Sequence, residues 1–262
     1  ELPPSEVIAL VRRGAPADDP ATLCACGLFL LAAGKPDDAA AAFAKAREAG
    51  ADVARHLALL ERYRADSLEA AAEALLAFER ATELAPGNFA AWIQRGLALG
   101  KLGRFGDAAG AFETATRISP GDRAAWYEMG LAYFSLGRHR EALGALDRAL
   151  ELDPENAAAW FRRALSLSAL GDHAAAVESL DRSLALNPAD GRAWHEKGLG
   201  LRTLGRLEEA LEALSHSVEV EPGDPEAWFH QGEVLRDLGR DGEAAQAFEA
   251  VTGLNPEHRD AW

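Results

Sequence analysis

Small and apolar residues recur along most of this chain with a period of 34 residues. Each period holds a Trp, a small residue four positions later, an Ala sixteen positions after the Trp, and a Phe or Leu twenty positions after it. The Trp residues are Trp92, Trp126, Trp160, Trp194 and Trp228. Small residues let two helices approach closely, while Trp and Phe or Leu fill the space around them. We therefore interpret the Trp as a scaffold residue at the seam between helices rather than a ligand platform.

Polar residues and glycines mark the predicted ends of these helices. An Asn or Asp stands four residues before each Trp, where a helix needs an N-cap: Asn88, Asp122, Asn156, Asp190 and Asp224. A Gly eleven residues after each Trp supplies a turn: Gly103, Gly137, Gly171, Gly205 and Gly239. The second helix ends before a Pro, whose ring would clash inside a helix. Each period is therefore expected to form an antiparallel helix pair.

A single pair cannot bury its apolar face alone, so neighbouring pairs must stack. The Trp, the small residue, the Ala, the Phe or Leu and the Pro at these spacings resemble the tetratricopeptide repeat (TPR) family. The resemblance implies an all-α fold, a right-handed superhelical solenoid of antiparallel helix pairs. It also implies that the first helices line the concave face, where partner peptides usually lie.

The repeat pattern divides the chain into four predicted parts. These are a capping helix over 1–19, two degenerate TPR units over 20–88, five regular units over 89–258, and the start of a truncated eighth unit over 259–262. The capping helix is expected because an end repeat would otherwise expose an apolar face.

The second degenerate unit departs from the pattern in its first half. Ala58 stands in place of the Trp and Glu69 in place of the turn Gly, while Ala74, Phe78 and Ala81 keep the register of the second helix. Glu69 follows Asp66 by three residues, which resembles a capping box and predicts that a long second helix begins at that point.

Composition narrows the possible partners. The chain has 262 residues, rich in Ala and Leu, and a net charge of −15. This charge argues against binding to nucleic-acid phosphates, and the sequence contains no apolar run as long as a membrane span. The chain begins at Glu1 without a signal peptide. We expect a fragment of a longer, cytoplasmic protein that binds neither nucleic acid nor membrane.

We find no motif for catalysis, a metal or a cofactor. The chain has no Gly-rich phosphate loop, no nucleophile elbow and no paired zinc-binding histidines. Its only cysteines, Cys24 and Cys26, are expected to be buried free thiols. His195 and His230 could both face the groove from neighbouring repeats, as ordinary groove histidines. We therefore predict a protein that is not an enzyme.

The resemblance places the groove at positions one, five and eight after each Trp, which share one helix face. The candidate peptide-binding residues are Ile93, Leu97, Tyr127, Leu131, Phe134, Phe161, Leu165, His195, Leu199, Arg202, Phe229 and Arg236. The centre of this groove is apolar and its C-terminal end is charged, which suits an amphipathic helix or a short hydrophobic segment. The alternative is that these side chains only pack against neighbouring first helices.

Two further departures from the family are relevant. The Lys, Asn and Arg that clamp the carboxylate end of a peptide in some TPR domains are replaced by apolar residues here. Three residues after the Trp, where the family usually has Leu, stand Arg95, Met129, Arg163, Lys197 and Gln231. We expect the long polar side chains there to lay their stems along the packed surface with their heads in water.

These features predict a non-enzymatic scaffold that binds a protein or peptide, such as an amphipathic helix, in its concave groove. One alternative is self-association, because the chain ends at the start of an eighth repeat and could stack on another copy through that end. Another is that the chain is the regulatory or substrate-recruiting arm of a larger enzyme.

Overall fold

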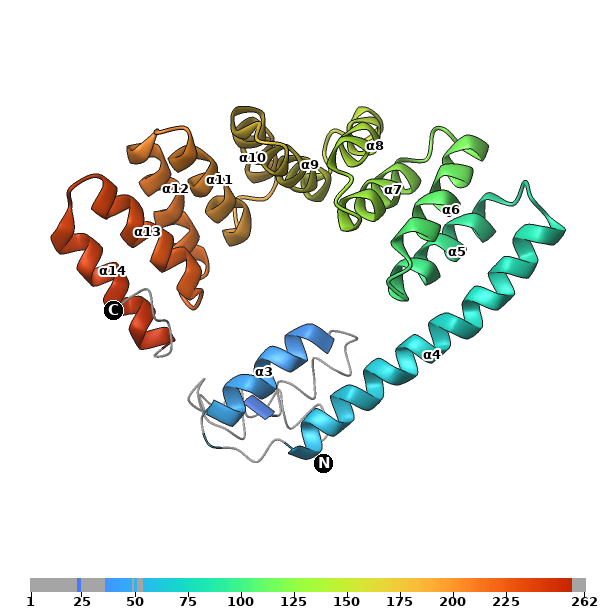
Figure 1. Ribbon diagram of the computed structural model, residues 1–262, viewed down its shortest axis with the longest axis horizontal. Coiled ribbons are helices and arrows are strands. Elements are labelled where there is room, and N and C mark those ends of the chain that lie inside the picture. The colour runs from blue at the N-terminus through green and yellow to red at the C-terminus, as the bar shows by residue number, and fades with distance from the viewer. Residues whose placement is uncertain (1–22, 25–35, 49, 51–53, 256–262) are drawn as a thin grey trace. The chain divides into compact units, whose positions relative to one another are not determined.

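The computed structural model describes residues 23–24, 36–48, 50 and 54–255, and all regular structure in these ranges is α-helix (Figure 1). The chain divides into two compact units, 1–77 and 78–262. The expected capping helix over 1–19 and the truncated repeat over 259–262 lie outside the described residues.

Five helix pairs make up most of the second unit. They are α5 (Phe89–Lys101) with α6 (Phe105–Ile118), α7 (Arg123–Ser135) with α8 (His139–Leu152), α9 (Ala157–Ala169) with α10 (His173–Leu186), α11 (Gly191–Thr203) with α12 (Leu207–Val220), and α13 (Pro225–Asp237) with α14 (Asp241–Leu254). Each helix packs on its neighbours along the chain. The all-α array of antiparallel helix pairs is confirmed.

The predicted caps form as expected. Asn88, Asp122, Asn156 and Asp190 each accept a hydrogen bond from the backbone N–H three residues later, and Asp224 accepts one from the N–H of Glu226. At the other end, the turn glycines adopt a positive φ of 71–84°, which a side chain would strain. The sequence therefore encodes both ends of every first helix.

Close packing within each pair depends on the small residue four positions after the Trp. A Cβ added to Gly130 would lie 2.8 Å from Cγ of Leu146, which is itself fully buried. A second buried position lies seven residues after the Trp and was not singled out from the sequence: Leu99, Tyr133, Leu167, Leu201 and Leu235. Together these residues form the core between the paired helices.

The tryptophans of α5, α7, α9, α11 and α13 are scaffold residues, but they are half-buried rather than enclosed. Each indole Nε1 donates a hydrogen bond to the backbone carbonyl of the Pro six residues earlier, at 2.8–3.0 Å. The residue before each Trp, always Ala, is more deeply buried. The Trp thus ties the connecting loop to the first helix, with one ring face towards water.

The long polar residues three positions after the Trp bond to the flanking second helices instead of ending in water. Arg163 donates to Asp147 at 2.7 Å and to Ser179 at 2.6 Å, while Lys197 pairs with Asp181 at 2.7 Å. The expectation that their heads point freely into solvent is wrong, because carboxylates and hydroxyls of the flanking second helices lie within reach. These contacts form a polar seam between repeats.

The expected helix start at Asp66 is also wrong. A single helix, α4 (Ala54–Leu84), runs through this position without a break. The physical reason is that Glu69 replaces the turn Gly and the surrounding residues are mostly strong helix formers. Ala74, Phe78 and Ala81, which keep the register of a second helix, are half-buried in α4.

In the first unit, helix α3 (Pro36–Glu48) keeps the register expected of a second helix. Ala39, Phe43 and Ala46 are fully buried, and Gly50 turns the chain with a φ of 89°. Cys24 is a buried free thiol, as expected, whereas Cys26 lies outside the described residues.

The first helices form the inner side of the array in the second unit. Over the described helices, α5 contacts α7, α7 contacts α9, α9 contacts α11 and α11 contacts α13, and these contacts are more extensive than those between second helices. Figure 1 shows the same helices along the inside of the arc from α5 to α14. Side chains on the free face of the first helices therefore line a concave surface.

Candidate peptide-binding groove

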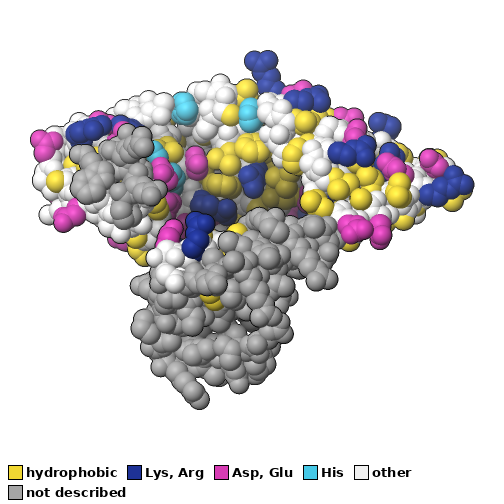
Figure 2. Space-filling view, turned by 60° about the horizontal axis from the view of Figure 1, so that its bottom comes forward, with side chains coloured by type: hydrophobic (Ala, Val, Ile, Leu, Met, Phe, Trp, Pro, Cys, Tyr) yellow, Lys and Arg dark blue, Asp and Glu magenta, His cyan; other side chains and the backbone are white. Residues whose placement is uncertain are grey.

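All twelve predicted groove residues belong to first helices, and none is fully buried. Leu97 is the most exposed of the aliphatic members, at 37%. Figure 2 shows apolar side chains gathered in the hollow of the array with basic side chains beside them. The residues therefore sit together on one face, partly open to solvent.

Aromatic side chains at the centre of the groove both pack and remain accessible. Tyr127 packs against the buried residues Leu146 and Leu150 of α8. Phe161 packs against the buried cluster that includes Ala164 and Leu167. Each ring therefore packs on a buried cluster while it stays only half-buried itself.

Two arginines of the groove lie against these rings. The Arg162 guanidinium lies 5.7 Å from the ring centre of Phe134, and that of Arg192 lies 5.9 Å from the ring centre of Phe161. Burial raises the pKa of Tyr127, and the charge of Arg162 opposes this rise. Sequence analysis did not select Arg162, although its place two residues after a Trp is next to a predicted groove position. The aromatic rings are thus held in place by cation–π contacts.

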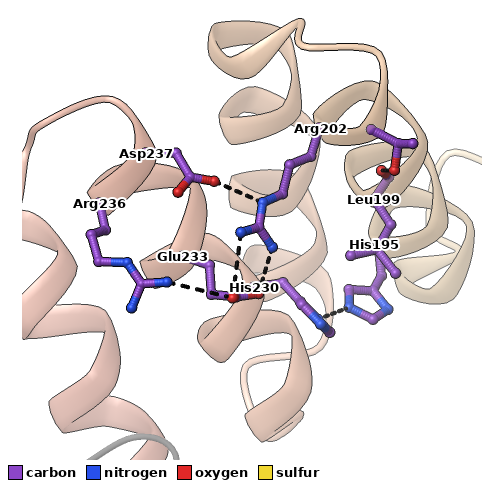
Figure 3. Close-up of polar contacts among 8 residues, drawn as sticks. His195, Leu199, Arg202, His230, Glu233, Arg236 and Asp237 are labelled. Carbon is purple, nitrogen blue, oxygen red and sulfur yellow. Dashed lines mark hydrogen bonds and ion pairs between the residues drawn. The ribbon is translucent and has the colours of Figure 1, made fainter.

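The charged end of the groove is an ion-pair network between α11 and α13 (Figure 3). Arg202 pairs with Glu233 at 2.5 Å and with Asp237 at 2.9 Å, and Arg236 reaches Glu233 at 3.7 Å. Arg202 and Glu233 are largely buried. Because the charges already satisfy one another, this end offers a partner less unpaired charge than its composition predicts.

His195 and His230 meet on the same face, as the sequence suggested. Nε2 of His195 lies 2.8 Å from Nδ1 of His230 (Figure 3). Burial, and then the charge of His230, lower the pKa of His195. Within the described residues no group of three or more His, Cys, Asp or Glu side chains could hold a metal ion. This arrangement is therefore a hydrogen-bonded histidine pair.

A pocket opens on the groove where α5, α6 and α7 meet. Its volume is about 260 Å³, and its lining includes Leu97, Gly100, Phe112, Glu128 and Leu131. Gly100 occupies the position that Phe134 takes one repeat later, eight residues after the Trp. A Cβ added to Gly100 would meet no atom within 4 Å. The missing side chain therefore leaves a recess in the groove.

None of the described helices is both long and apolar enough to cross a membrane. The search of curated proteins found no match for this chain. Solved structures that resemble it include YrrB, described as a TPR protein with an unusual peptide-binding site. That structure has a TM-score of 0.63 and 23% sequence identity, and the match covers 71% of this chain and 95% of YrrB.

Structures of MamA resemble the chain to a similar degree. One has a TM-score of 0.62 at 22% identity, over 66% of this chain and 94% of MamA. MamA from Desulfovibrio magneticus RS-1 has a TM-score of 0.62 at 24% identity, over 65% of this chain and 97% of that protein. These similarities support the fold.

The tetratricopeptide repeat family model matches most of the sequence. Its matches cover residues 60–123, 93–154, 127–191 and 195–259, so together they reach all five helix pairs. The caps, the turn glycines and the buried small residues described above account for this match physically. The chain belongs to the tetratricopeptide repeat family.

Proposed function

We propose that this protein is a non-enzymatic scaffold that binds a segment of another protein in the concave groove of α5–α13. The observation that carries the proposal is the row of half-buried apolar side chains at the groove centre, above all Tyr127, Phe134 and Phe161. Apolar surface that stays partly exposed on a rigid face is typical of sites for protein segments. YrrB, which has a similar fold, is described as having a peptide-binding site.

The packing of these rings favours a preformed site. Phe134 and Phe161 each have a guanidinium group about 6 Å from the ring centre, which limits their rotation. A site that is ordered before binding loses less conformational entropy when the partner arrives. An amphipathic helix or an extended apolar segment could therefore bind without rearrangement of the first helices.

The proposal is tested by capturing partners from a lysate of the source organism. We expect the wild-type chain to retain a partner that the double variant Phe134→Ala/Phe161→Ala loses. The matched control is Leu136→Ala/Leu170→Ala, which removes exposed apolar side chains at 38% and 42% exposure from the C-caps of the same two helices. Circular dichroism of all three proteins must show equal helicity.

Equal capture by the groove variant and the wild type would contradict the proposal. A groove variant that loses helicity would instead assign the two phenylalanines to the core. In that case Leu131→Ser, on the half-buried face of α7, provides the second test.

A further inference from the structure

The pocket between α5, α6 and α7 combines an apolar recess with a carboxylate that lacks a counter-charge. Leu97, Leu131 and Phe112 supply apolar walls, and Glu128 lies at the edge on α7. Glu128 is half-buried, and in the described part of the chain it has no ion-pair or hydrogen-bond partner. This contrasts with Glu233 in the same groove, which is paired with Arg202 and Arg236.

An unpaired carboxylate in a partly desolvated position is unfavourable in the free protein. Burial raises the pKa of Glu128, and the Glu128 charge in turn helps to raise the pKa of the adjacent Tyr127. A cation supplied from outside would relieve this cost, and it would act most strongly where water is already excluded. The carboxylate is therefore matched to a basic group.

Lys101 also lines the pocket, but it does not neutralise Glu128. Its side chain is exposed at the end of α5, and it lies outside ion-pair distance of Glu128. An exposed ammonium group is well solvated and gains little from a partner. Because Glu128 is half-buried and Lys101 is exposed, the pocket favours a positively charged group in a ligand.

The same register position carries a second unpaired carboxylate further along the groove. Glu196 stands two residues after Trp194, as Glu128 stands two residues after Trp126. Glu196 is also half-buried, and burial raises its pKa. Between them, Arg162 of α9 is already engaged by Phe134 and Tyr127. The groove thus offers two free anionic positions and an apolar recess.

We propose that the pocket over Gly100 binds an apolar side chain of a basic amphipathic segment, which places a Lys or Arg beside Glu128. This inference rests on the proposed function and specifies the chemistry of the partner. The net charge of −15 adds long-range attraction for such a segment. A longer basic segment would reach Glu196 with a second cation.

The test uses a synthetic amphipathic helix of Leu and Lys, labelled for fluorescence anisotropy, and the same peptide with Glu in place of Lys. We expect the Leu–Lys peptide to bind the full chain and the Leu–Glu peptide not to bind. Glu128→Gln should weaken binding of the Leu–Lys peptide about tenfold, because one partly desolvated charge pair is lost. The matched control is Glu178→Gln on α10, an exposed acid with no partner in the described residues, which should bind as the wild type does.

The recess is tested separately from the charge. Gly100→Leu should fill it and weaken binding about tenfold or more, since the anchor side chain is excluded. Gly110→Leu is the control, because Gly110 is an exposed position inside α6 where an added Cβ also meets no atom within 4 Å. Both variants should keep full helicity, since an added Cβ meets no atom within 4 Å at either position.

The outcomes separate this inference from the function on which it rests. Equal binding of the two peptides, no binding of the Leu–Lys peptide, or binding unaffected by Glu128→Gln and Gly100→Leu would overturn the inference. Groove-dependent capture of a cellular partner would still support the scaffold function in each of those cases. Only equal capture of the cellular partner by the wild type and by the Phe134→Ala/Phe161→Ala variant would refute the scaffold function.

Discussion

At the scale of single residues, the repeated Trp divides its surface between core and solvent. Trp160 donates from Nε1 to the carbonyl of Pro154 at 2.9 Å, and the Arg163 guanidinium lies 5.7 Å from its ring centre. Leu146, in contrast, is fully enclosed beside Gly130. The larger side chain, Trp160, therefore does not necessarily contribute more to stability than the smaller, enclosed Leu146.

Trp160→Ala should lower the free energy of unfolding by about 2–4 kcal/mol, because a half-buried ring and one hydrogen bond are lost. This is less than a fully enclosed aromatic residue would cost. Trp160→Phe should lower it by only about 1 kcal/mol, since the exposed carbonyl of Pro154 can bond to water instead. Urea unfolding followed by circular dichroism measures both. Equal losses would show that the ring body contributes little.

Glu128→Gln should leave the protein as stable as the wild type, or more stable, at neutral pH. The pKa of Glu128 in the folded state is raised by burial above its unfolded value of about 4.3. Stability from such a group is present below the unfolded pKa and is lost as the pH rises through the folded pKa. The variant's advantage should therefore disappear at about pH 4 and below.

Urea midpoints of wild type and Glu128→Gln across this pH range provide the measurement. Glu178→Gln, the exposed control, should follow the wild type throughout. A loss of stability in Glu128→Gln at neutral pH would mean that the carboxylate has a partner in solution.

At the scale of helices, each joint between repeats uses different chemistry on the same framework. The joint between α9 and its neighbours has Arg163 bonded to Asp147 and Ser179. The joint between α11 and α13 has the histidine pair and the Arg202 network. Because a repeat contacts mainly its neighbours, each joint should respond to its own local chemistry.

Acidification should weaken the α11–α13 joint through His195. Burial, and then the charge of His230, lower the pKa of His195 below its usual value of about 6.5, against the opposing charges of Asp224 and Glu226. A group with a lowered folded pKa contributes stability above the unfolded pKa and loses it as the pH falls through the folded pKa. The wild type should thus lose stability below about pH 6.5.

His195→Gln, which cannot become charged, should show a smaller fall in urea midpoint between about pH 7.5 and about pH 5. The control variant, His216→Gln, lies on α12 outside the α11–α13 joint and should leave that fall in place. An identical fall in the urea midpoint of His195→Gln and the wild type would show that His195 is not the source of the acid sensitivity.

Helix ends and helix pairing could be predicted from the sequence because they depend on local chemistry. The cap at Asn88 and the turn at Gly103 need only their own neighbours along the chain. The same local reasoning failed at Asp66, where a capping-box pair lies inside the continuous helix α4. A capping pair without a turn residue before it does not end the preceding helix.

The candidate groove was predictable by position but not by contact. Register placed Phe134 and Phe161 on first helices, where both stay half-buried, yet their contacts with Arg162 and Arg192 depend on the spacing between repeats. The recess over Gly100 is likewise a consequence of three helices meeting, with no motif of its own. The free carboxylate of Glu128 could be recognised only when the partners of every other groove charge were known.

At the scale of the whole molecule, the repeats from α5 to α14 form a chain of nearest-neighbour contacts. Packing within this unit links each helix to the next and each first helix to the following first helix. Glu79 and Thr82, in the last turns of α4, also belong to this unit and bond to Arg95 of α5. The second unit therefore includes the end of α4 that packs against its first repeat, through Glu79 and Thr82 on Arg95.

This organisation predicts that residues 78–262 fold alone. The fragment should retain the helical signal expected for α5–α14 and bind the same partner as the full chain, because every groove residue lies within it. The helix segment over 78–84 is too short to be stable by itself, so we expect it to fray unless its contacts with α5 hold it. Arg95→Ala in the fragment should then lower the unfolding temperature more than Arg163→Ala lowers it, because Arg95 bonds to both Glu79 and Thr82 of that segment. Circular dichroism melts of the fragment and both variants measure this difference. A fragment without helicity would show instead that residues 1–77 are required for the array to fold.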